Sequence, residues 1–218
     1  MKKSFNKASQ SGRTLCAPAG SVRHHMKSKI AVEKARSWLQ NNSKESYSEE
    51  CPDLGISEAV NGIVDSNEDF NMADLLYLLA LENESEWVLE KIEENDSLAW
   101  EVVEAGIQYH DFEARWQIAV LLGFLGTSRA APYLEHLCHD EDEYVRRRAL
   151  LELRQHDKTL SETIAIGWLD SIHEYSRMVA VDTLKYINST EFESAAKKLI
   201  YDSSSIVKNR LAELRSNA

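Results

Sequence analysis

The sequence predicts an all-α fold arranged as an α-solenoid, a superhelix in which helix pairs stack side by side. The first observation is a repeat, because Arg115, Arg146, Arg177 and Lys208 follow one another at intervals of 31 residues. The second is that apolar residues recur three, four and seven positions after each marker, the spacing of one helix face. Patterns typical of β-strands are almost absent.

The first helix of each unit is predicted to bury this face against its neighbours. Its apolar positions hold Ile118, Ala149, Ala180 and Leu211; then Ala119, Leu150, Val181 and Ala212; then Leu122, Leu153, Leu184 and Arg215. The change to Arg215 in the last copy indicates a terminal helix with one polar side, as a capping element requires.

A second helix repeats in the same register. Its corresponding residues are Tyr133, Ile164 and Ala195; Leu137, Trp168 and Leu199; and Cys138, Leu169 and Ile200. Each unit is therefore a helix, a short turn and a second helix. Because one pair cannot bury its apolar stripe alone, the units are expected to share a continuous core.

The run Gly123–Leu134, with Asp142-Glu143-Tyr144-Val145-Arg146 and Ala149, resembles the short form of the HEAT repeat. This form occurs in phycobilin lyases and in many bacterial scaffold proteins. The resemblance is close over residues 111–157, fades to register alone over 158–218, and is only helical over 30–110. It implies a HEAT-like solenoid and, in most such proteins, a protein-binding role.

The first half of the chain is predicted to be helical as well. Helices are expected over residues 30–39, from an N-cap at Ser57 to Val64 and from about Met72 to Leu81. Further N-caps are predicted at Ser85, Ser97, Asp111 and Asp142. Residues 1–25 are predicted to be a disordered basic leader and 26–218 a single α-helical repeat domain, with Met26 as an alternative start.

The charge is distributed unevenly along the chain. The formal net charge is -11, but residues 1–29 hold seven bases and no acid, so the rest carries -18. Such an acidic body argues against nucleic-acid binding, which depends on clustered Lys and Arg. No apolar run is long enough to span a membrane, and no signal peptide is recognisable, so a cytoplasmic protein is expected.

The acidic middle of the chain is the predicted protein-binding site. Residues 45–104 contain 18 acids and one base, whereas residues 144–218 have a net charge of +2. Tryptophans lie among these acids, a composition typical of interface anchors. Alternatively, the acids form a solvated face that only keeps the protein soluble. The predicted binding residues are Trp87, Glu90, Glu93, Glu94, Asp96, Trp100, Glu101, Glu104 and Trp116.

Trp116 shares its repeat position with Arg147, Met178 and Asn209, which indicates an exposed ridge. The alternative is that Trp116 covers the helix before it. Cys138 lies at an apolar helical position and is expected to be an inert buried thiol.

No metal, cofactor or catalytic residue is predicted. Deoxyhypusine hydroxylase, a HEAT-like di-iron enzyme, uses repeated His-Glu pairs as ligands, but His173-Glu174 occurs once here. Gly123 and Gly126 follow a helix and lack the Lys-Ser or Lys-Thr of a phosphate loop. Arg146 is expected to pair with an acid of a neighbouring repeat, and Arg147 and Arg148 to form a solvated face.

These observations favour a non-catalytic protein-binding module, monomeric when free, whose partner is a basic protein. In its sharper form it is an immunity or inhibitor protein that neutralises a basic toxin. The alternatives are a phycobilin-lyase-like enzyme, which would attach a bilin to a client cysteine, and a general assembly scaffold.

Overall fold

A computed structural model describes residues 19–42, 55–66, 70–82 and 86–216 of the chain. Every regular element within these ranges is helical, as expected for an all-α protein. The first helix begins at Ala19, seven residues before the expected start of the helical domain at residue 26. Most of the predicted leader, residues 1–18, and the predicted cap Ser85 lie outside the described residues.

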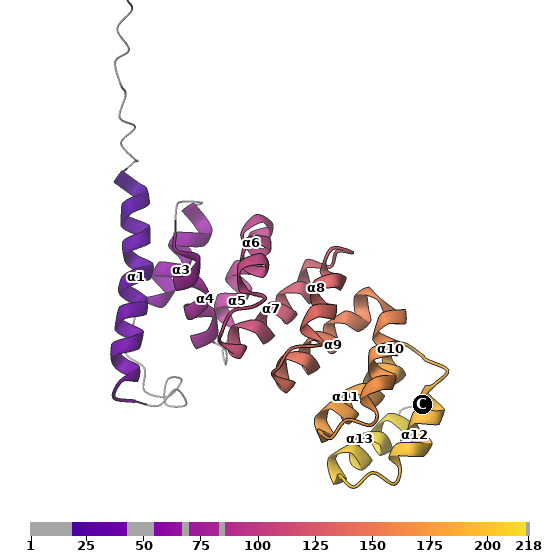
Figure 1. Cartoon of the computed structure of the whole chain (residues 1–218). Coiled ribbons are helices and arrows are strands. Elements are labelled where there is room, and N and C mark those ends of the chain that lie inside the picture. Colours follow the sequence, from indigo (N-terminus) through magenta and orange to yellow (C-terminus); the bar gives the residue numbers. More distant parts are fainter. Residues whose placement is uncertain (1–18, 43–54, 67–69, 83–85, 217–218) are drawn as a thin grey trace, which may run out of the picture.

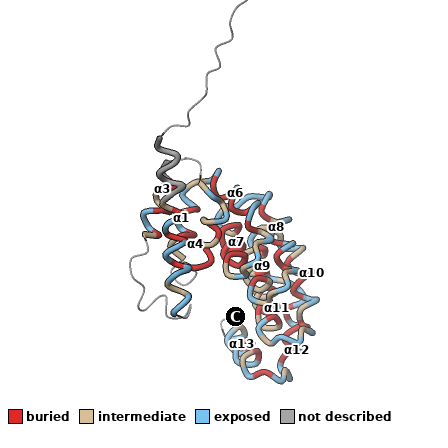
Figure 2. The backbone as a smooth tube through the Cα atoms, turned by 60° about the vertical axis from the view of Figure 1, so that its left-hand side comes forward, coloured by how far each residue is buried: buried red, intermediate tan, exposed pale blue. Residues whose placement is uncertain are grey.

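The helices form a curved double layer (Figures 1 and 2). The inner layer contains α1 (Ala19–Leu39), α4 (Met72–Leu81), α7 (Phe112–Leu125), α9 (Glu143–His156), α11 (Glu174–Tyr186) and α13 (Ser205–Ser216). The outer layer contains α3 (Ile56–Ser66), α6 (Asp96–Gly106), α8 (Ala130–Leu137), α10 (Lys158–Trp168) and α12 (Phe192–Leu199). Short α5 (Trp87–Glu93) contacts α3, α6 and α7. Each unit of the predicted repeat is thus one inner and one outer helix.

The core is one continuous cluster of apolar side chains between the two layers. Most of the repeat positions predicted to be buried lie in it, since Ile118, Ala149 and Ala180 have no exposed surface and Leu211 is 2% exposed. Ala212 on α13 and Ile200 after α12 are exposed, so the prediction is wrong at these two positions near the end of the array. Arg215, at the position of three buried leucines, is exposed on the terminal helix. The 31-residue periodicity therefore identifies the buried face of the inner helices up to the terminal one.

The helix caps agree with the sequence only in part. Asp111 accepts a hydrogen bond from the backbone N–H of Glu113 at 3.0 Å, and Asp142 accepts one from that of Tyr144 at 2.8 Å, so both predicted caps are confirmed. The caps predicted at Ser57 and Ser97 are wrong, because α3 begins at Ile56 and α6 at Asp96. Asn95 caps α6 instead.

The basic residues that mark the repeat tie successive units together. Arg115 donates to the carboxylate of Asp140, and Arg177 to that of Asp202, each 25 residues further along the chain. Arg146 differs, because its Nη1 donates to the backbone carbonyls of Asp140 and Glu141, at 2.7 and 2.9 Å. The expectation that Arg146 pairs with an acid of a neighbouring repeat is therefore wrong. The equivalent position between Asp140 and Asp202, 31 residues from each, is Ser171, which has no carboxylate to bind Arg146.

Candidate functional site

The predicted acidic surface lies on α5 and α6, at the outer side of the array. Helix α5 buries Val88, Leu89 and Ile92. Helix α6 buries Leu98, Ala99, Val102, Val103 and Gly106. This packing turns the acidic residues of both helices to solvent, and all of the predicted ones are exposed: Glu90, Glu93, Glu94, Asp96, Glu101 and Glu104. We call these six residues the acidic face.

Two of the six carboxylates are paired. Glu94 accepts from the Lys91 ammonium at 2.6 and 2.8 Å, and Glu104 accepts from Arg129. Within the described part of the chain, Glu90, Glu93, Asp96 and Glu101 form no ion pair. Exposed pairs contribute little to stability, so the acidic face is a concentration of negative charge with only slight structural value.

The tryptophans of this region are half-buried and do not project from the surface. Trp87 and Trp100 both pack against the core. The Trp100 ring lies 6.0 Å from that of Tyr133 on α8, and the Arg129 guanidinium lies 4.0 Å above it. Each tryptophan therefore presents only part of its ring to a partner, and access to Trp100 depends on the position of Arg129.

A shallow cavity of about 270 Å³ lies beside Trp100, where α6 meets α8. Its lining comes from the end of α6 and from α8: Ile107, Gln108, Pro132, Tyr133 and His136. Tyr133 belongs both to this cavity and to the ring contact with Trp100. Helix α6, which carries part of the acidic face, thus ends at a small apolar depression of the kind that can receive a side chain of a partner.

Trp116 does not join this surface. It is 6% exposed and lies on α7, in the inner layer. The ring of Tyr144 meets it edge-on at 5.5 Å, and the Arg148 guanidinium lies 5.2 Å from its centre. The expectation of an exposed anchor at Trp116 is wrong because residues of the next inner helix cover its position. Trp116 is instead a buried packing residue whose ring contacts the helix after it, while the alternative, that it covers the helix before it, stays a prediction.

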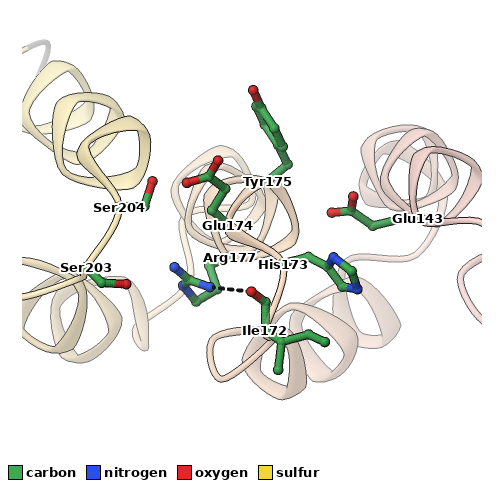
Figure 3. Close-up of a pocket in the computed structure, with 8 residues that line it drawn as sticks. All are labelled: Glu143, Ile172, His173, Glu174, Tyr175, Arg177, Ser203 and Ser204. Atoms are coloured by element: carbon green, nitrogen blue, oxygen red, sulfur yellow. Dashed lines mark hydrogen bonds between the residues drawn. The ribbon is translucent and has the colours of Figure 1, made fainter.

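A second cavity, of about 480 Å³, lies at the edge of the array where α9, α11 and α13 begin (Figure 3). His173 and Glu143 line one side, Ser203 and Ser204 the other, and Tyr175 projects from α11 between them. The cation in this cavity is already engaged, because Arg177 binds Asp202 at 2.7 Å and the carbonyls of Ser171 and Ile172.

The isolated His173-Glu174 pair lies at this edge without further ligands. In the described ranges, no group of three or more His, Cys, Asp or Glu side chains could hold a metal ion. Cys138 is 1% exposed, and burial raises the pKa of its thiol to about 12, so it is the buried, unreactive thiol that the sequence predicts. Among the described helices, none is both long and apolar enough to cross a membrane.

A feature that sequence reasoning missed lies on the inner face of α9. The sequence predicts that Arg146 pairs with an acid of a neighbouring repeat and that Arg147 and Arg148 form a solvated face. Arg147 and Arg148, together with Arg154, instead lie over aromatic rings of α7, α9 and α11. The recurrence of tyrosine at positions 144 and 175, one repeat apart, is the sequence signal that could have indicated aromatic partners there.

Comparison with known families supports this architecture. A family model described as HEAT repeats matches residues 80–154, which run from the end of α4 through α9. The match begins about thirty residues before the segment 111–157 in which the repeat motif is recognisable, and so includes α5 and α6. No curated protein matches the chain. The chain is an all-α solenoid that carries HEAT-like repeats.

Proposed function

We propose that this protein is a non-catalytic interaction scaffold whose acidic face binds a basic surface of another protein. HEAT repeats generally mediate protein–protein contacts. The observation that carries the proposal is the combination on α5, α6 and α8 of six exposed carboxylates with half-buried Trp100 and the apolar cavity beside it. Like-signed charge at this density attracts a partner of opposite charge and accelerates encounter.

In the narrower form of the proposal, the protein inhibits its partner. A basic surface held against the acidic face is covered and neutralised, as in an immunity protein that blocks a basic toxin. A general scaffold would bind the same surface and leave its activity intact. The two forms differ in the activity of the captured protein, so an activity assay of the complex distinguishes them.

The test is a charge reversal with a matched control. Glu101→Lys with Glu104→Lys changes the acidic face, whereas Glu191→Lys with Glu193→Lys makes the same change in net charge at exposed residues around the start of α12. The probes are two basic proteins, lysozyme and cytochrome c, and the partners captured from an extract of the source cells. We expect the first variant to weaken binding at least about tenfold, roughly 1.4 kcal/mol, and the control to weaken it far less.

Equal losses in both variants would mean that only net charge matters and would contradict a localised site. Unchanged binding by the first variant would exclude the acidic face altogether. Because Glu104 also pairs with Arg129 on α8, thermal unfolding of both variants checks that the outer layer stays intact.

A further inference from the structure

The inner face of α9 presents three arginines that are held flat against aromatic rings. Arg154 lies 4.1 Å from the ring centre of Tyr186, Arg147 lies 4.9 Å from that of Tyr175, and Arg148 lies 5.2 Å from that of Trp116. Stacking restricts a guanidinium while leaving the N–H groups at its edge able to donate. The contacts join three consecutive inner helices, α7, α9 and α11.

The hydrogen-bonding capacity of these arginines is largely unused within the described chain. The Nε atoms of Arg147, Arg148 and Arg154 are buried and have no hydrogen-bond partner, so the Nη groups are the donors that a bound molecule can reach. Two of the three form ion pairs that are too long for strong hydrogen bonds, at 3.5 Å between Arg147 and Glu143 and 3.6 Å between Arg148 and Glu86. Burial lowers the pKa of Arg154, as expected of a guanidinium that is partly desolvated without a bonded carboxylate.

Arg146, on the same helix, provides an internal contrast. Its Nη1 donates to two backbone carbonyls, and Arg115 and Arg177 each bind a carboxylate through two nitrogens. The arginines that mark the repeat are thus hydrogen-bonded within the fold. The three stacked arginines are oriented by the rings but keep N–H groups that donate no hydrogen bond. Oriented donors bind an acceptor with a smaller entropic cost than flexible ones do.

The acids on this inner face are mostly engaged by other partners. Glu143 accepts from the Ser176 hydroxyl at 3.0 Å, Glu152 accepts from the Gln155 amide at 3.1 Å, and Asp182 accepts from Arg210 at 2.7 Å. Apolar surface lies beside the arginines, because Tyr144, Tyr175 and Tyr186 are 37%, 40% and 50% exposed. The face therefore offers cationic donors next to accessible rings.

We infer that the inner face of α9 and α11 is a docking surface for an acidic polypeptide segment. Carboxylates of the segment bind the edges of Arg147, Arg148 and Arg154, and its apolar side chains rest on the exposed tyrosines. Three inner helices about 10 Å apart cover roughly 20–30 Å, a distance that about eight extended residues span. A polypeptide is favoured over nucleic acid because three arginines on a body of net charge -18 offset a few carboxylates, whereas a continuous phosphate backbone carries a charge at every nucleotide.

This surface is separate from the acidic face, which lies on α5 and α6 and attracts the opposite charge. One scaffold could therefore hold an acidic segment on its inner side and a basic protein on its outer side. Since the two sites share no residue, failure of one proposal leaves the other standing.

The test measures fluorescence anisotropy of a labelled peptide of about eight alternating glutamates and leucines, long enough to cross the inner helices. We expect Arg147→Gln, Arg148→Gln and Arg154→Gln together to weaken binding at least about tenfold. The control, Arg129→Gln, Lys197→Gln and Lys198→Gln, makes the same charge change in the outer layer and is expected to bind normally. Glu101→Lys with Glu104→Lys is also expected to retain peptide binding, which separates this site from the acidic face.

Two further measurements keep the inference testable if the triple glutamine variant unfolds. Replacing the three arginines by lysine keeps the charge but removes the planar fork, and is expected to reduce affinity by a smaller factor. Hydrogen exchange with bound peptide is expected to protect residues 143–156 and 174–186. The inference would be overturned if the control variant lost as much peptide affinity as the triple glutamine variant, or if bound peptide protected other helices from exchange. It would also be overturned if a peptide with Gln in place of Glu bound equally well, or if a thymidine oligonucleotide bound more tightly than the peptide.

Discussion

The carboxylate of Asp140 binds the guanidinium of Arg115 from the preceding unit with both oxygens, at 2.8 Å from Nε and 2.9 Å from Nη2. Its backbone carbonyl also accepts from Arg146 of the following helix at 2.7 Å. Both side chains of the ion pair are less than one tenth exposed. Asp140 therefore connects two units, and its removal would leave a buried guanidinium without its carboxylate.

We expect Asp140→Ala to lower the free energy of unfolding by about 3–5 kcal/mol, the usual cost of breaking a buried pair. The control is Glu141→Gln, which changes a carboxylate that also contacts Arg115, at 3.3 Å, but is 87% exposed. That change is expected to cost less than about 1 kcal/mol. Urea unfolding followed by circular dichroism measures both, and similar values for the two variants would contradict the bridging role of Asp140.

Ser171 occupies the repeat position at which Asp140 and Asp202 provide a carboxylate to an arginine of the preceding unit. Its hydroxyl accepts from the backbone N–H of His173 at 3.2 Å, as the Asp140 carboxylate accepts from that of Asp142 at 2.8 Å. Because the local turn is the same, Ser171→Asp is expected to keep this bond and add a carboxylate within reach of Arg146. We expect stabilisation of about 1 kcal/mol in urea unfolding. In an Arg146→Gln background the gain should vanish, and a gain that persists there would show that Arg146 is not the partner.

The ion pair between Arg177 and Asp202 makes the stability of the fold depend on pH in a known direction. Hydrogen bonds from Arg177 lower the pKa of Asp202, and burial opposes this shift. A carboxyl whose pKa is lower in the folded than in the unfolded protein stabilises the fold above its unfolded value, about 3.9, and this stabilisation is lost as the pH falls through the folded value. The difference in unfolding free energy between the protein and Asp202→Ala should therefore be about 3 kcal/mol at neutral pH and shrink below about pH 4. A difference that stays constant across this range would contradict the pairing.

The repeat explains why the second half of the fold was predictable. Residues at intervals of 31 mark the inner helices, and the buried positions follow from the period of the α-helix. Helices α5 and α6 lack the motif, so their layer could not be assigned from the sequence, although Met72–Leu81 was predicted with its observed bounds. The two cap errors arose because a serine near a helix start competes with neighbouring Asn or Gly, and only the backbone decides which residue caps.

The binding surfaces were predictable to different degrees. Charge counting placed the acids on exposed positions, since exposure of a carboxylate follows from its cost of burial. It could not place Trp116, because Tyr144 and Arg148, which cover its ring, belong to another helix. The stacked arginines were missed for the same reason, as their partners lie in neighbouring units and become adjacent only when the helices pack.

Burial should protect Cys138 from chemical modification. Desolvation raises the pKa of its thiol to about 12, so at pH 8 the reactive thiolate is roughly a thousandfold rarer than in an unfolded chain. We expect a small maleimide to label Cys138 at least about a hundredfold more slowly in the native protein than in denaturant. Mass spectrometry of the peptide containing Cys138 separates its labelling from that of Cys16 and Cys51. Rapid native labelling would mean that α8 opens readily from the core.

Glu152 is expected to cost stability at neutral pH. Its carboxylate lies against α7, where a Cβ added to Gly123 would clash with Oε2. Burial raises the pKa of Glu152, and the opposing effects of Arg148 and Arg154 are smaller. Because the folded protein then favours the protonated carboxyl, the contribution of Glu152 to stability is full below its unfolded pKa of about 4.3 and is lost as the pH rises through the higher folded value.

Glu152→Gln keeps the shape of the side chain and removes this dependence. We expect the variant to be more stable than the unchanged protein at pH 7 and to have no such advantage at pH 4. Urea unfolding at a series of pH values measures the difference. If the variant is instead less stable at pH 7, the attraction of Glu152 to Arg148 and Arg154 outweighs its desolvation. The stacked arginines would then be partly neutralised from within the fold, and their affinity for an acidic segment would be correspondingly lower.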